Sequence, residues 1–105
     1  MAEPNARYEL QSLLENLLGS KNVYYQPPES IKMTYPAIVY ERSRIENRHS
    51  NNEVYIQNHA YMVTVIDRMP DSDVVEQLSR WPLCRHDRHF VSDNLNHDVF
   101  TLYWR

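Results

Sequence analysis

The chain has 105 residues, a formal net charge of −3, 42% hydrophobic residues and 24% charged residues. This balance is typical of one small globular domain, residues 1–105, and excludes a disordered chain. The net charge argues against binding nucleic acid through bulk electrostatics, and the single cysteine, Cys84, excludes an internal disulfide and a multi-cysteine zinc site. No segment resembles a signal peptide or a membrane span, so we expect synthesis in the cytoplasm and no membrane partner.

The first predicted element is an amphipathic helix over residues 6–18. Leucines recur there at helical spacing and predict one apolar face, namely Leu10, Leu13, Leu14, Leu17 and Leu18. Gly19 stands where a left-handed C-terminal cap is wanted. A short strand over residues 22–26 is predicted next, and Pro27-Pro28 ends it.

Two strand-like runs with a polar spacer follow. Residues 35–40 read Y-P-A-I-V-Y and residues 60–66 read A-Y-M-V-T-V-I, apolar at almost every position, which predicts burial on both faces. The spacer has no Gly or Pro, and polarity rises along it from both sides. Antiparallel pairing would therefore continue outward as a β-hairpin arm at about residues 42–57, with its tip near residues 48–52.

A second helix and a second hairpin complete the predicted fold. Pro70 opens the helix, with Asp71 or Asp73 as its cap, and its buried side would carry Val74, Val75, Leu78 and Trp81. Strands over 85–92 and 97–104 flank a turn that contains Asp93-Asn94. The order predicts an α+β fold: a mostly antiparallel sheet of four or five strands, two helices packed on it, and the long arm.

The polar residues of the last hairpin are the best enzymatic candidate. His86, His89 and His97 lie near carboxylates and suggest a small metal-dependent hydrolase or nuclease. Their spacing argues against it, because strand residues three apart point to opposite faces. Cys84 lacks a following glycine or helix N-terminus that would supply an oxyanion hole. We expect no catalytic residue, cofactor or metal, and hence no enzyme.

The predicted arm offers a contact surface. Arg42, Arg44 and Arg48 share strand parity, which suggests a nucleic-acid module with tyrosines as stacking partners. Interleaved acidic residues favour a protein contact instead, at Glu41, Glu46 and Glu53. Because little core lies near the arm, Tyr55 is the first choice for an interface anchor. The expected interface residues are Arg42, Arg44, Arg48, Tyr55 and Ile56.

Three segments carry a family resemblance: Y-P-A-I-V-Y-E-R-S-R-I-E-N-R-H-S-N-N, Y-M-V-T-V-I-D-R-M-P-D-S-D-V-V-E-Q-L and D-R-H-F-V-S-D-N-L-N-H-D-V-F-T-L-Y-W. Over about residues 6–104 the chain resembles the small tail-terminator or tail-completion (head-tail joining) proteins of long-tailed bacteriophages. The resemblance rests on the overall similarity of these segments and on the order of the predicted helices and strands. It brings no active-site motif.

The resemblance implies a structural virion protein at the head-proximal end of the tail. Its partners would be copies of itself in a homo-oligomeric ring, usually a hexamer, the tail tube protein and the head-tail connector protein. DNA would pass through the lumen only as cargo. A neck or head-completion adaptor is the alternative with the same size and architecture.

Overall fold

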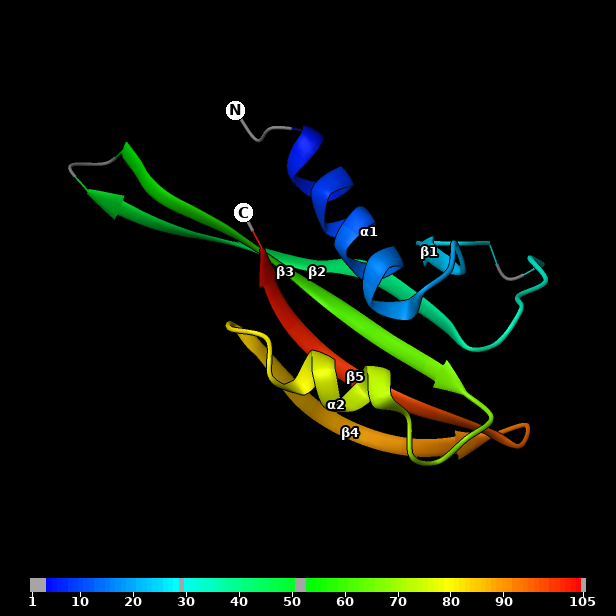
Figure 1. The fold of residues 1–105 in the computed structure, drawn as a ribbon. Coiled ribbons are helices and arrows are strands. Elements are labelled where there is room, and N and C mark those ends of the chain that lie inside the picture. Colours follow the sequence, from blue (N-terminus) through cyan, green and yellow to red (C-terminus); the bar gives the residue numbers. More distant parts are fainter. Residues whose placement is uncertain (1–3, 29, 51–52, 105) are drawn as a thin grey trace.

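The computed structural model describes residues 4–28, 30–50 and 53–104, without the side chains of residues 4–6, 44, 46–50 and 53–58. The chain forms helix α1 (Pro4–Leu18), strands β1 (Val23–Tyr25), β2 (Ala37–Ser50) and β3 (Glu53–Asp67), helix α2 (Asp73–Ser79), and strands β4 (Cys84–Ser92) and β5 (Leu95–Trp104). Figure 1 shows both helices on the same side of one twisted sheet. The α+β prediction is confirmed, with two helices and five strands.

The sheet is mixed, with strand order β1-β2-β3-β5-β4. β1 runs parallel to β2, with Val23 opposite Ile38, whereas the β2–β3, β3–β5 and β4–β5 pairs are antiparallel. A parallel neighbour needs a crossover, and the segment after β1 provides it. This segment contains the cis Tyr35–Pro36 peptide bond. β2 and β3 are the longest strands, at 14 and 15 residues.

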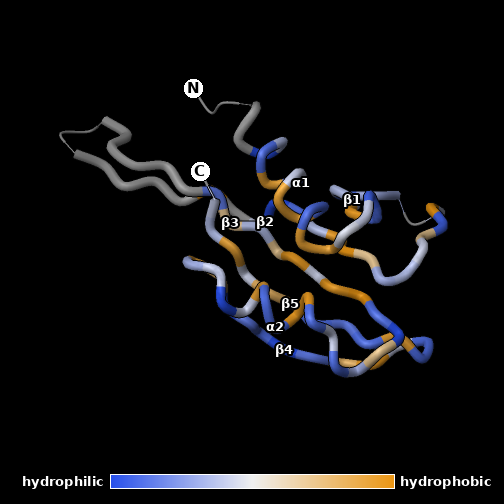
Figure 2. The backbone as a smooth tube through the Cα atoms, viewed as in Figure 1, coloured by the Kyte–Doolittle hydropathy of each residue, from blue (hydrophilic) through white to orange (hydrophobic). Residues whose placement is uncertain are grey.

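One hydrophobic core lies between the helices and one face of the sheet. Leu10 and Leu14 of α1 and Leu78 of α2 are fully buried against Val63 and Phe100 of the sheet. Figure 2 shows these hydrophobic segments gathered in the body of the molecule. The prediction for α1 was wrong at one position: Leu13 is 41% exposed, because it lies at the margin of the buried stripe.

The opposite face of the sheet has no helix on it in the described part of the chain. Ile38, Tyr40 and Val63 point into the core, so by alternation Val39, Met62 and Thr64 point the other way. These three side chains are partly exposed. Ala37, Ala60 and Ile66 of the same runs also lie on this face by alternation and are buried. Burial of the apolar runs on both faces is therefore confirmed for these residues and wrong for the three partly exposed ones.

Backbone geometry explains how the elements end. Gly19 has φ +79°, and both its N–H and that of Ser20 bond the Glu15 carbonyl, so the expected cap of α1 is confirmed. Asp93 and Asn94 have φ +54° and +62°, which fits the two-residue β4–β5 turn. The N-cap of α2 is Ser72, one residue away from either expected aspartate, and its side chain makes no capping hydrogen bond.

Candidate functional site

The outer ends of β2 and β3 form a two-stranded hairpin beyond the other strands. β1 pairs only with Ile38–Tyr40, and the last β3–β5 pair is His59–Trp104. Beyond it, β2 and β3 stay paired with each other from Glu46–Asn58 to Ser50–Glu53. We call residues 46–50 and 53–58 the outer hairpin; it projects from the body in Figure 1. The strands are continuous through this point because neither contains Gly or Pro.

Some of the predicted interface residues lie in the outer hairpin, and others precede it in β2. Arg42 is exposed at the base, and its backbone N–H lies 3.4 Å from the Gln26 Oε1 atom. Arg48 and Ile56 face each other in the backbone register of the outer hairpin. The side chains of Arg44, Arg48, Tyr55 and Ile56 lie outside the described residues, so their contacts stay predictions.

A register shift at Ser43 lies between two of these arginines. Arg42 pairs with Tyr61 and Arg44 with Ala60, so one extra residue of β2, Ser43, lies between two pairs whose β3 members are adjacent. A bulge of this kind interrupts the strand alternation. The expected shared face of Arg42 and Arg44 assumed uninterrupted alternation. Because the side chain of Arg44 lies outside the described residues, that expectation stays a prediction. The Ser43 hydroxyl donates to the Ala60 carbonyl at 3.0 Å and supports the bulge.

A buried histidine marks the base of the outer hairpin. His59 lies between Ile45 and Trp104 in the sheet register, and its ring centroid is 6.4 Å from that of Tyr61. It is 9% exposed, and its Nδ1 atom has no hydrogen-bond partner in the described part of the chain. The sequence signal for this buried histidine is its position directly before the apolar run 60–66, and it was not among the predicted site residues.

Aromatic rings and one arginine attach the start of α1 to the sheet. The Arg7 guanidinium lies 4.2 Å from the Tyr25 ring centroid and 4.7 Å from that of Tyr8. The hydroxyl of fully buried Tyr40 donates to the Gln11 Oε1 atom. Gln11 in turn donates from Nε2 to the Val23 carbonyl at 2.9 Å. Burial is the main cause that raises the pKa of Tyr40.

The histidines of the last hairpin are divided between the two faces of the sheet. The His86 Nε2 atom lies 3.0 Å from Asp98 Oδ1, and His89 Nε2 lies 3.1 Å from Asn96 Oδ1. A bulge between His86 and Arg88 gives these two histidines the same parity, so their predicted opposite orientation was wrong. His97 stacks on Phe90 on the other face, with ring centroids 4.6 Å apart.

This arrangement does not bring the three histidines together. Among the residues that the structure describes, no group of three His, Cys, Asp or Glu side chains is placed to hold a metal ion. Two of the histidine rings already face an oxygen acceptor within the hairpin. The geometry therefore offers no support for the hydrolase hypothesis.

Asp87 occupies the bulge and is held by two neighbours. It accepts from Thr101 Oγ1 at 2.6 Å and from Arg85 Nε at 2.9 Å. The Thr101 hydrogen bond is the main cause that lowers the Asp87 pKa. The Cys84 pKa is raised to about 11, first by burial and second by Asp87. A thiol in this environment is a poor nucleophile near neutral pH.

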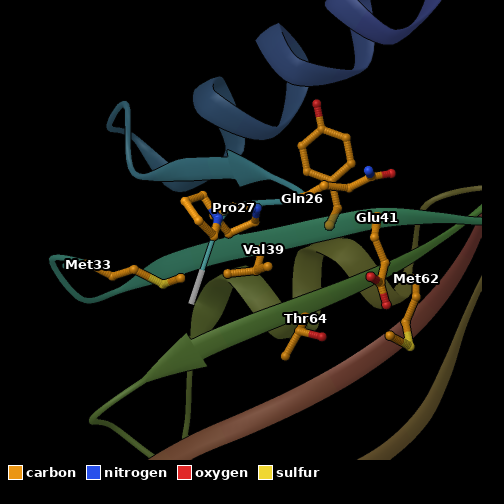
Figure 3. A pocket seen from close by; sticks show the side chains of 9 residues that line it. Gln26, Pro27, Met33, Val39, Glu41, Met62 and Thr64 are labelled. Atoms are coloured by element: carbon orange, nitrogen blue, oxygen red, sulfur yellow. The ribbon is translucent and has the colours of Figure 1, made fainter. Parts of the chain in front are cut away.

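A shallow groove of about 290 Å³ opens on the helix-free face, beside the segment after β1. Figure 3 shows Pro27 and Met33 on one side of it and Val39, Met62 and Thr64 on the strands. Glu41 supplies its carboxylate. The lining is mainly apolar with one charge, which suits a protein side chain better than a catalysed reaction.

Comparison with known proteins finds no family model that matches this chain and no matching curated protein. Within the described residues, no helix has the length and apolar character that a membrane crossing requires.

Proposed function

We propose that this protein is a structural assembly protein whose outer hairpin contacts a neighbouring subunit or the tail tube, in a ring that ends a phage tail and joins it to the head connector. The observation that carries the proposal is the projecting hairpin. Its backbone pairs only within itself among the described residues, so both of its edges can accept another strand. The family resemblance supplies the biological setting.

The shape of the molecule supports a contact at a distance from the core. Its principal extents are 51 × 23 × 23 Å, so the long axis is about twice each of the others. A projection of this kind reaches a neighbour without burying the body. When the contact is head-to-tail, repetition closes a ring if the rotation per subunit divides a full turn. Subunits of net charge −3 would also let DNA pass without adhering to the assembly as a whole.

Electron microscopy of the purified full-length protein tests the ring. We expect annular particles with a central hole. A population of monomers at all concentrations, without rings in the presence of tail tubes, would remove the ring proposal. Binding to tail tube ends or to isolated head connectors then distinguishes the tail terminator from the neck adaptor.

A shortened hairpin tests the contact itself. Residues 47–57 are replaced by Asn-Gly, which joins the paired residues Glu46 and Asn58 through a two-residue turn. The core pairs from Ala37–Ile66 to Glu46–Asn58 are kept, so we expect a folded protein that does not assemble. The control replaces Asp93-Asn94 by Asn-Gly in the other hairpin and should assemble normally. Normal assembly of the shortened variant would refute a role for the outer hairpin.

A further inference from the structure

The helix-free face of the sheet is more apolar than a solvent-facing sheet surface should be. Antiparallel sheets that face water on one side alternate polar and apolar residues. Here Val39, Met62 and Val99 share this face with Ile66 and Phe90. No described helix covers them. Val99 and Ile66 are nevertheless buried, at 5% and 8% exposed, whereas Val39 and Met62 are partly exposed and Phe90 is 39% exposed. The strands have the composition of a sheet buried on both sides, but the described part of the chain supplies a layer of helices on one side only.

The charges on this face have a directional arrangement. One row across the sheet reads Glu41, Met62, Thr101, Arg85, from β2 to β4. The neighbouring row ends at Arg88 on the same margin. Glu41 and Arg88 make no ion pair within the described part of the chain, whereas Arg85 pairs with Asp87. The face is thus acidic at its β2 margin and has a net positive charge at its β4 margin.

We propose that this face packs against the same face of a second copy of the chain, about a two-fold axis parallel to the strands. Such an axis exchanges the two margins. Glu41 of each copy then lies over the partner margin that carries Arg85 and Arg88, and Met62 lies over Thr101 of the partner. Face-to-face sheets pack about 10 Å apart, which side chains of this size fill.

The charges select this axis over the other two-fold arrangement. An axis perpendicular to the strands would place Glu41 over Glu41 of the partner and the arginines over the arginines. Like charges opposed in this way disfavour association. The proposed contact uses neither edge of the outer hairpin, so it is independent of the ring contact and extends beyond it.

Cysteine cross-linking tests the axis in the full-length chain with Cys84→Ser. Oxidation of an equimolar mixture of Met62→Cys chains and Thr101→Cys chains should give a covalent heterodimer, whereas either variant alone should not; keeping the two cysteines in separate chains excludes a disulfide between these neighbouring positions of one chain. Leu13→Cys, on the outer side of α1, is the control and should stay uncross-linked. Cross-linking of either variant alone, or no heterodimer above the control in the mixture, overturns the proposal.

A charge exchange tests the margins by sedimentation equilibrium. Glu41→Arg and Arg88→Glu should each weaken the dimer by about two- to fivefold, as exposed ion pairs do. The double variant should restore most of the affinity, because the two charges again oppose each other across the interface. Circular dichroism checks that each variant is folded. Additive weakening in the folded double variant would contradict the proposed pairing, and so would a wild-type chain that stays monomeric.

Discussion

Removal of one hydroxyl group, in Tyr40→Phe, isolates the polar link between α1 and the sheet. Tyr40 is fully buried, and its hydroxyl donates to Gln11. The Arg7 Nη1 atom lies 3.4 Å from the same oxygen, a weaker contact. The ring remains in phenylalanine, so the apolar packing against Tyr25 and Tyr61 is retained.

The expected cost is one neutral hydrogen bond, about 1 kcal/mol in the free energy of unfolding. It stays near this value because Gln11 is only partly buried, so water can reach the Oε1 atom that loses its donor. For a domain of this size, about 1 kcal/mol lowers Tm by roughly 4–8 °C. In urea, the same loss lowers the midpoint concentration of unfolding by about 0.5–1 M, and the m value stays constant.

A double-mutant cycle with Gln11→Ala identifies the partner. Gln11→Ala alone also removes the hydrogen bond to the Val23 carbonyl, so it should cost more than Tyr40→Phe. The coupling free energy between the two sites should be about 0.5–1 kcal/mol. Tyr24→Phe, whose hydroxyl makes no hydrogen bond within the described residues, is the control and should change stability by less than about 0.5 kcal/mol. Additivity within about 0.3 kcal/mol would refute the inferred link.

Three further predictions follow from local geometry. The raised Cys84 pKa, about 11 against 9.0, predicts alkylation at pH 8 about a hundredfold slower in the folded than in the urea-unfolded chain; equal rates would show that the thiol is not buried. The lowered Asp87 pKa means that its hydrogen bonds stabilise the fold above the unfolded value near 3.8 and lose this effect as pH falls through the folded value, so Thr101→Val should flatten the acid side of the stability profile below about pH 4. An unchanged profile in that variant would contradict the assigned cause. Leu83 is 71% exposed at φ +61°, so Leu83→Asn should raise the free energy of unfolding by about 0.5–1 kcal/mol, and a loss in chemical denaturation would show that its side chain is needed.

The fold followed from patterns that depend on short-range periodicity. Leucine spacing located α1, the φ of Gly19 agrees with the cap expected there, and polarity gradients aligned β2 with β3. The parallel placement of β1 was not predicted, because three residues carry no signal for direction. The predicted opposite faces of His86 and His89 were wrong because a bulge at Asp87 intervenes. Bulges depend on partner strands as well as local sequence, so parity alone cannot reveal them.

Of the two candidate surfaces, the sequence indicated the outer hairpin but not the helix-free face of the sheet. The long spacer indicated a projecting hairpin from polarity alone, and β2 and β3 do pair to Ser50–Glu53. The helix-free apolar face could not be predicted from the sequence. An apolar run is equally consistent with a strand whose two faces are both buried by elements of its own chain. Only the placement of both helices on one face separates these cases.

The continuity of β2 and β3 from the core to the outer hairpin has a mechanical consequence. The strands that carry Val63 and Tyr40 in the core are the same strands that project, without a linker between. A pull along the projection therefore loads the β3–β5 hydrogen bonds in shear, many at once, from His59–Trp104 to Asp67–Asn96. Slippage by one residue would turn Val63 away from the core. A force applied at the outer hairpin would therefore be resisted by many hydrogen bonds of the core sheet at the same time.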